Sequence, residues 1–245
     1  MTVGDAPSNY DLPPKLIRVW RVHLDRTPEI GGKLEALLSQ DEKDRARRFH
    51  FERDRRRFTM ARGALRTILS GYLGVNPALI AFDYGPQGKP FLAVTASDIW
   101  FNVTHSQELA LVAVSRDREL GVDLEFVRPF TWKGQTPEHF FSLREVEAFR
   151  SLPDDSQQSA FFTCWTRKEA YIKARGGGLS IPLDCFDVSV VPGEAAALLE
   201  VRNDPVEPSR WGMAELQPAQ GYTGALVAQG RDWHFGYCDW RGSEE

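Results

Sequence analysis

The segment FFTCWTRKEAYIKARGGGLS, residues 161–180, constrains the fold most strongly, because a helical apolar pattern runs directly into three glycines. At 100° per residue, Phe161 and Ile172 share one apolar face, and Glu169 and Lys173 lie one turn apart at the edge of that face. The glycines supply the backbone freedom that ends a helix. We therefore expect an amphipathic helix that holds a charged pair beside a buried surface. The alternative is an ordinary core helix with a surface ion pair.

A second constraining segment is GVDLE at residues 121–125, which follows the apolar run at 109–114 after a short polar turn. The two segments together predict a β-hairpin. Alternate side chains of a strand share a face, so Asp123 and Glu125 point to the same side. Two carboxylates about 7 Å apart repel each other unless a cation lies between them, and Mg²⁺ takes oxygen ligands of this kind. The segment predicts a magnesium site or, alternatively, a solvated strand face.

These two motifs resemble the paired signature of the 4′-phosphopantetheinyl transferases of the larger Sfp-like type. GVDLE is followed about forty residues later by WTRKEAYIK. The same family pattern is met upstream by GKP at 88–90 and FNVTHS at 101–106, and downstream by the glycine-rich Leu-Ser segment. The motifs run in the family's order from about Arg45 to Asp187. Each motif alone is weak, but five in order are specific.

The resemblance assigns coenzyme A contacts to the first part of the chain. Arg45 is similar to a basic position that contacts the 3′-phosphate, and the Gly-Lys-Pro segment lines the adenine and 3′-phosphate end of the site. His105 corresponds to a histidine that donates to the 3′-phosphate, with the preceding hydroxyl on the phosphate side. Here that hydroxyl belongs to Thr104 where serine is usual, which keeps the donor and adds a methyl group. The implied contacts are Arg45, Gly88, Lys89, Pro90, Thr104 and His105.

The resemblance also implies the metal ligands and the catalytic residues. Asp123, Glu125 and Glu169 would hold Mg²⁺. Glu145 lies in a segment similar to the family's F-F-S-x-x-E, whose glutamate has been assigned as general base. Two alternatives stay open for it: Glu145 could cap the helix begun at Ser142, or a metal-bound water could remove the proton instead. Lys173 is expected to act as a catalytic cation or, alternatively, only to pair with Glu169.

A basic tract at 43–66 carries ten positive residues and predicts one long helix that buries a single apolar stripe. Phosphate or an acidic protein partner would suit its arginines, and a merely solvated helix face is the alternative. Ser39 and Glu42 match a capping box. Further strands are expected at 17–24, 80–84, 99–103, 186–191, 223–227 and 233–237, further helices at 29–38 and 138–152, and a polar link at 153–159.

Composition excludes several function classes. The 245 residues are 42% hydrophobic and 26% charged, which is ordinary for a globular protein, and the net charge of −4 gives no case for nucleic acid. The three cysteines lack metal-site spacing and fit a reducing cytoplasm, and no apolar run approaches the length of a membrane span. The sequence has no P-loop and no G-x-S-x-G nucleophile. A nucleophile must then come from elsewhere, which agrees with a family whose attacking serine belongs to its partner.

The resemblance implies an α+β fold of two similar α/β halves in a pseudo-twofold arrangement, with the active site in the cleft between them. We expect a flexible leader at 1–15, an N-terminal half at 16–118 on the coenzyme A 3′-phosphate and adenine side, and a C-terminal half at 119–245 on the magnesium and carrier-protein side. No internal repeat is visible at the level of sequence identity.

The implied reaction is the Mg²⁺-dependent transfer of 4′-phosphopantetheine from coenzyme A to a serine of an acyl, polyketide or peptidyl carrier protein, with release of 3′,5′-ADP. The enzyme would be a cytoplasmic monomer without a nucleic-acid or membrane partner. Two alternatives are a non-catalytic carrier-protein or nucleotide binder of the same fold, and an unrelated Mg²⁺-dependent phosphodiesterase.

Overall fold

The computed structural model describes residues 10–93, 97–128 and 136–242. The first half of the chain contains β1 (Leu16–His23), α1 (Pro28–Leu37), α2 (Gln40–Arg47), α3 (Glu52–Leu73), β2 (Phe82–Tyr84), β3 (Pro90–Leu92), β4 (Ile99–Ser106) and β5 (Leu109–Arg116). The second half contains β6 (Leu120–Phe126), α4 (Leu143–Arg150), α5 (Asp154–Arg175), β7 (Phe186–Val188), β8 (Leu198–Val201), α6 (Glu207–Arg210), β9 (Trp211–Leu216), β10 (Tyr222–Gln229) and β11 (His234–Asp239).

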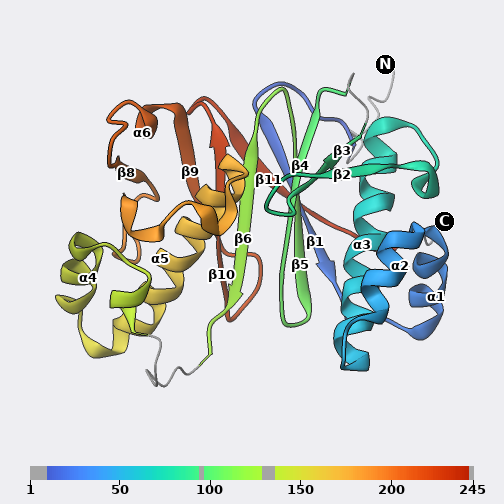
Figure 1. Cartoon of the computed structure of the whole chain (residues 1–245), viewed down its shortest axis with the longest axis horizontal. Helices are drawn as coiled ribbons and strands as arrows, with labels where there is room; N and C mark the ends of the chain where they lie inside the picture. Colours follow the sequence, from blue (N-terminus) through green and yellow to red (C-terminus); the bar gives the residue numbers. More distant parts are fainter. Residues whose placement is uncertain (1–9, 94–96, 129–135, 243–245) are drawn as a thin grey trace, which may run out of the picture.

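Two sheets with the same internal order form the centre of the molecule. One has the order β11-β1-β5-β4 and the other has the order β6-β10-β9. The strands β1, β5 and β4 correspond to β6, β10 and β9, and neighbouring strands within each of these two sets pair antiparallel. Apolar side chains from both sheets, among them Val19 and Val122, share one buried cluster between the sheets. Helices α1, α2 and α3 flank the first sheet and α4 and α5 flank the second (Figure 1). The layers are therefore helix, sheet, sheet, helix.

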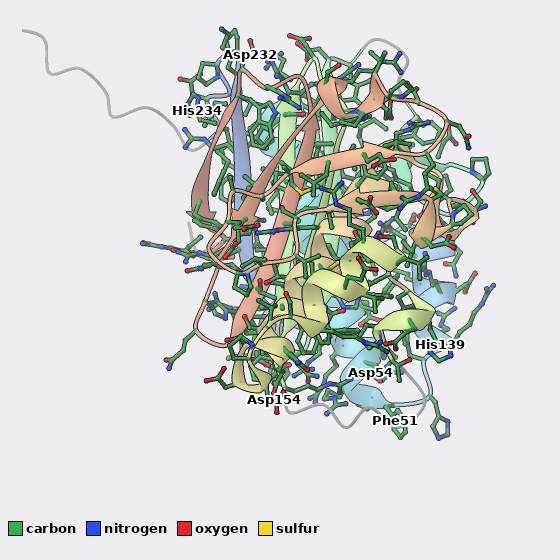
Figure 2. The ribbon with its side chains drawn as sticks, turned by 90° about the vertical axis from the view of Figure 1, so that its left-hand side faces the viewer. Phe51, Asp54, His139, Asp154, Asp232 and His234 are labelled. Carbon is green, nitrogen blue, oxygen red and sulfur yellow. The ribbon has the colours of Figure 1, made fainter. Side chains whose placement is uncertain are left out.

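The two long helices show the pseudo-twofold relation of the halves. Both α3 and α5 have 22 residues, and both end at a glycine in the left-handed region, Gly74 with φ 65° and Gly176 with φ 69°. Asp54 and Asp154, in the first turns of these helices, lie toward the same end of the molecule, opposite to Asp232 (Figure 2). The expectation of two similar α/β halves is confirmed. The boundary at 118/119 stays a prediction, and β11 crosses it by pairing in parallel with β1.

The predicted hairpin of 109–114 with 121–125 is wrong. These residues form β5 and β6, which lie in different sheets. β5 already pairs with β1 on one side and β4 on the other, so it has no free edge for the strand that follows it. The expected leader overlaps residues 1–9, which lie outside the described residues.

Three helix boundaries also differ from the prediction. The helix expected at 138–152 is the shorter α4, which begins after its N-cap Ser142. The basic tract at 43–66 is not one helix: α2 ends at Arg47 and α3 begins at Glu52, and between them the Phe49 ring packs on Phe58 at 5.3 Å. The predicted link at 153–159 is helical, because Pro153 at the N-cap and acidic residues in the first turn favour a helix start there. The capping box at Ser39 is confirmed. In the described part of the chain, no helix combines the length and apolarity needed to cross a membrane.

Candidate active site

The two sheets meet edge to edge at β4 and β6, and side chains of alternate β4 residues make the junction. Asn102 Oδ1 accepts a hydrogen bond from the Val122 amide at 2.9 Å, and Ser106 Oγ accepts one from the Phe126 amide at 3.1 Å. β6 is an edge strand of its own sheet, so these side chains satisfy amides that its partner β10 leaves free. The FNVTHS segment therefore binds directly to GVDLE.

The same β4 side chains orient the predicted carboxylates. Thr104 Oγ1 donates to Asp123 Oδ1 at 3.1 Å, and Ser106 Oγ donates to Glu125 Oε2 at 3.0 Å. Asp123 is buried at 4% exposure, and its Oδ2 atom has no hydrogen-bond partner among the described residues. As the alternation predicted, both carboxylates lie on the face opposite to the apolar side chains that enter the core. A buried carboxylate oxygen without a partner marks a position where a cation would be stabilising.

Lys173 reaches across from α5 to the strand. Its Nζ lies 2.5 Å from Asp123 Oδ1 and donates to Thr104 Oγ1 at 3.3 Å. The alternative in which Lys173 pairs with Glu169 on its own helix is wrong, since its ion pair among the described residues is with Asp123. A Cβ at Gly121 would lie 2.2 Å from the Ala170 carbonyl oxygen, so glycine is required for α5 to approach β6 this closely.

The three carboxylates repel one another. Burial and the neighbouring Asp123 raise the pKa values of both Glu125 and Glu169, and the Lys173 ammonium opposes these effects. One ammonium thus faces three carboxylates, a donor set that fits a hard divalent cation in chemistry and in charge. In the described ranges no three His, Cys, Asp or Glu side chains are already gathered as a metal cage. Binding a metal here would require these side chains to move closer together.

A pocket of about 330 Å³ connects this cluster to the first half of the chain. Gly88, Lys89 and Pro90 line one side of it, and Glu169 and Lys173 line the other. The pocket lies between the halves, as the resemblance implied. It brings together Gly88, Lys89 and Pro90, which were predicted to contact coenzyme A, with Lys173 and the predicted metal ligand Glu169. The other predicted site residues are not among those that line it: Arg45, Thr104, His105, Asp123, Glu125 and Glu145.

Lys89 ties the two halves together at this pocket. Its Nζ donates to the carbonyl oxygens of Leu120 at 3.0 Å and Ala174 at 3.2 Å, which belong to the second half. The Ala174 carbonyl is in the last turn of α5, where a cation is favourable. Burial lowers the pKa of Lys89 to about 8. Lys89, which was predicted to contact coenzyme A, therefore also links the two halves by hydrogen bonds.

His105 lies among positive charges. Its ring is exposed at the surface but partly desolvated, and this desolvation together with Lys173, Arg57 and Arg45 lowers its pKa. Arg45 is exposed, with its guanidinium 5.5 Å from the centre of the Phe58 ring. An uncharged imidazole with several cations near it is a favourable place for an anion to bind. The sequence did not single out Arg57, whose charge acts on His105 while its guanidinium pairs with Asp25 at 2.7 Å.

Thr104 and Glu145 have surroundings that differ from those implied by the resemblance. The Thr104 hydroxyl contacts Asp123 and Lys173, which places it on the carboxylate side. Glu145 is buried at 1% exposure and is not among the residues that line the pocket. It accepts hydrogen bonds from the Ser142 and Val188 amides at 2.9 and 2.8 Å. Ser142 and Glu145 form the capping box that the sequence indicated.

Comparisons with known proteins find similarity to the same family along most of the chain. A family model described as 4′-phosphopantetheinyl transferase, N-terminal, matches residues 32–117, and one described as the 4′-phosphopantetheinyl transferase superfamily matches residues 119–238. The 4′-phosphopantetheinyl transferase HetI of Nostoc sp. is 42% identical over 229 residues, 93% of each protein. The 4′-phosphopantetheinyl transferase of Bacillus subtilis is 31% identical over 174 residues, 70% of this chain and 76% of that protein.

Among solved structures, a Chronobacterium ammoniagenes ACPS–CoA complex matches 46% of this chain and 97% of its own, with 19% identity and a TM-score of 0.34. The sequence relatives alone decide the family, because the first of them is similar over nearly its whole length. The chain belongs to the 4′-phosphopantetheinyl transferase superfamily and is an enzyme of this type.

Proposed function

We propose that this enzyme transfers the 4′-phosphopantetheine group from coenzyme A to a serine hydroxyl of an acyl, polyketide or peptidyl carrier protein. The new bond joins the serine oxygen to the phosphorus that carries pantetheine, the bond from that phosphorus to the bridging oxygen breaks, and 3′,5′-ADP leaves. One observation carries the proposal: a single pocket between the halves is lined by Lys89 from the first and by Glu169 and Lys173 from the second.

The first half supplies the charge complementarity for coenzyme A. The charges of Arg45 and Arg57 both act on the imidazole of His105, and Arg45 with His105 fits a phosphate monoester such as the 3′-phosphate. The Gly88-Lys89-Pro90 segment of the same half lines the pocket. These residues would hold the nucleotide end while the reacting pyrophosphate extends toward α5.

The second half supplies the residues for the reacting end. Asp123, Glu125 and Glu169 would hold a magnesium ion, whose charge would neutralise the pyrophosphate when bound. The unpartnered Oδ2 atom of Asp123 and the raised pKa values of the two glutamates support this assignment. Lys173 adds a positive charge at the same edge of the pocket, where it would stabilise charge that grows on the phosphoryl oxygens and the leaving group.

The test is intact-mass spectrometry of several purified apo-carrier proteins incubated with the enzyme, coenzyme A and Mg²⁺. We expect one carrier at least to gain the mass of a single phosphopantetheine, and 3′,5′-ADP to appear in equal amount. A carrier whose acceptor serine is replaced by alanine is the matched control. Absence of any mass gain across acyl, polyketide and peptidyl carriers would contradict the proposal, and hydrolysis of nucleotides instead would favour a phosphodiesterase.

A further inference from the structure

Each half of the molecule contains a short helix capped by a glutamate that also pairs with the long helix. In the first half, the Ser39 amide donates to Glu42 Oε2 at 3.1 Å, and Arg66 Nε of α3 lies 2.7 Å from the same oxygen. Glu42 and Arg66 are each only 1% exposed. Arg62 of α3 pairs with the other carboxylate oxygen, Glu42 Oε1, at 2.7 Å, so the glutamate joins α2 to α3 through two buried ion pairs.

The second half repeats this arrangement with other residues. The Ser142 amide donates to Glu145 Oε2 at 2.9 Å, and Lys168 Nζ of α5 lies 2.7 Å from that oxygen. Glu145 is 1% exposed and Lys168 is fully buried. Burial raises the pKa of Glu145, and the Lys168 ammonium opposes this effect.

The two buried cations also make the same further contacts. Each donates to two backbone carbonyl groups in the segment that follows its helix, and each lies over the ring of the phenylalanine that begins the next strand. Arg66 is 5.2 Å from the centre of the Phe82 ring, and Lys168 is 4.2 Å from that of Phe186. The carbonyl contacts of Arg66 are Pro77 at 3.0 Å and Ile80 at 2.8 Å, and those of Lys168 are Leu183 at 2.6 Å and Phe186 at 2.8 Å.

The long helices carry these cations at the same place. Arg66 stands eight residues before Gly74, and Lys168 stands eight residues before Gly176. In this register the positions of Glu169 and Lys173 correspond to Thr67 and Gly71 of the first half. The first half therefore has the complete buried assembly without an ionisable residue at either site position.

We propose that Glu145 and Lys168 are a positioning pair, the counterpart of Glu42 and Arg66, and that Glu145 acts through Lys168 on the orientation of α5. Lys168 directly precedes Glu169, so at 100° per residue the direction of one side chain fixes that of the next. With Lys168 held by an ion pair and two carbonyl groups, α5 cannot rotate about its axis. Glu169 and Lys173 are thereby kept facing the pocket. The serine proton then passes to water and not to Glu145.

A double-mutant cycle tests this proposal, with kcat, KM and Tm measured for the wild type, Glu145→Gln, Lys168→Gln and the double variant. Its kcat arm rests on the proposed function. A misplaced site residue lowers the rate by up to about a hundredfold, and loss of a general base lowers it by about a hundredfold or more. A single variant therefore does not distinguish a positioning residue from a general base. We expect non-additivity: in the background that lacks the Lys168 charge, Glu145→Gln lowers kcat and Tm no further. A general base would lose the same factor in kcat in both backgrounds, which would overturn the proposal.

Glu42→Gln is the matched control from the first half. It should lower Tm by at least as much, because Glu42 pairs with both Arg62 and Arg66, leave kcat near the wild-type value, and raise KM for coenzyme A because α2 carries Arg45. Glu145→Gln should instead lower kcat with little change in KM. Additive Tm losses for Glu145 and Lys168 would also overturn the proposal. The Tm measurements need neither carrier protein nor coenzyme A. They therefore test the coupling of Glu145 to Lys168 even if the wild type modifies no carrier protein and the proposed function is contradicted.

Discussion

Replacing Lys173 by alanine separates the stability of the carboxylate cluster from its catalytic role. The side chain of Lys173 is 29% exposed and the side chain of its partner Asp123 is 6% exposed. An exposed ion pair contributes less than about 1 kcal/mol, whereas removing one partner of a buried pair costs about 3–5 kcal/mol. Since this pair is intermediate, we expect a loss of about 2 kcal/mol, which lowers the Tm of a chain of this size by about 4–8 °C.

The effect on the rate should be larger and should not recover with the metal. Losing one contact that stabilises transition-state charge costs about 3 kcal/mol, or about a hundredfold in kcat. A divalent cation would partly replace the missing ammonium beside Asp123, so saturating Mg²⁺ should restore much of the lost Tm. It should leave kcat low, because Lys173 and the ion would act on different parts of the substrate's charge.

Scanning fluorimetry with Mg²⁺ or with chelator, together with steady-state transfer to a carrier protein, measures both effects. Lys173→Arg is the control that keeps the positive charge, and it should retain most of the Tm. Near-normal kcat in Lys173→Ala would refute the catalytic role and leave Lys173 as a structural partner of Asp123. A Tm that does not respond to Mg²⁺ in this variant would refute the metal assignment instead.

Three further predictions concern the same pocket. Asp123→Asn or Glu169→Gln should remove most transfer activity and the Tm response to Mg²⁺ while the protein stays folded, and wild-type turnover in excess chelator would argue against a metal site. His105→Ala should weaken the binding of coenzyme A more than that of dephospho-coenzyme A, and equal losses of affinity for the two donors would count against contact with the 3′-phosphate. Lys89→Ala should have the same effect and should also lower Tm, because the Lys89 hydrogen bonds between the two halves are lost. The raised pKa values of Glu125 and Glu169 mean that these carboxylates bind protons more readily in the folded than in the unfolded state, so the metal-free protein should lose stability as the pH rises above about 4.5. Because protons compete with the metal for these carboxylates, the Tm increase caused by Mg²⁺ should be smaller at about pH 5 than at about pH 8. A Tm increase that does not depend on pH would contradict this.

Local patterns predicted the parts of the fold that depend on few neighbours. The alternation of GVDLE placed Asp123 and Glu125 on one strand face, and Ser39 and Ser142 both form the capping boxes that their spacing indicates. Three glycines predicted the end of the central helix, which Gly176 caps in a left-handed conformation. These features follow from backbone geometry within a few residues.

Contacts between distant segments could not be obtained in this way. The pairing of Lys173 with Asp123 depends on how closely α5 approaches β6, and the spacing of charges along one helix contains no such information. The sheet to which β6 belongs depends on which strand edges remain free after β1 and β4 have paired with β5. The correspondence of Glu42 with Glu145 was hidden because arginine replaces lysine and most neighbours differ.

The junction of β4 and β6 has a consequence for hydrogen exchange. The amides of Val122 and Phe126 are bonded to the side chains of Asn102 and Ser106 and not to a neighbouring strand backbone. Separation of the two halves would expose these amides to solvent without breaking any backbone ladder within either sheet. Their exchange rates therefore report the opening of the cleft directly, and an occupied pocket that holds the halves together would slow both amides while those paired with β10 stay unchanged.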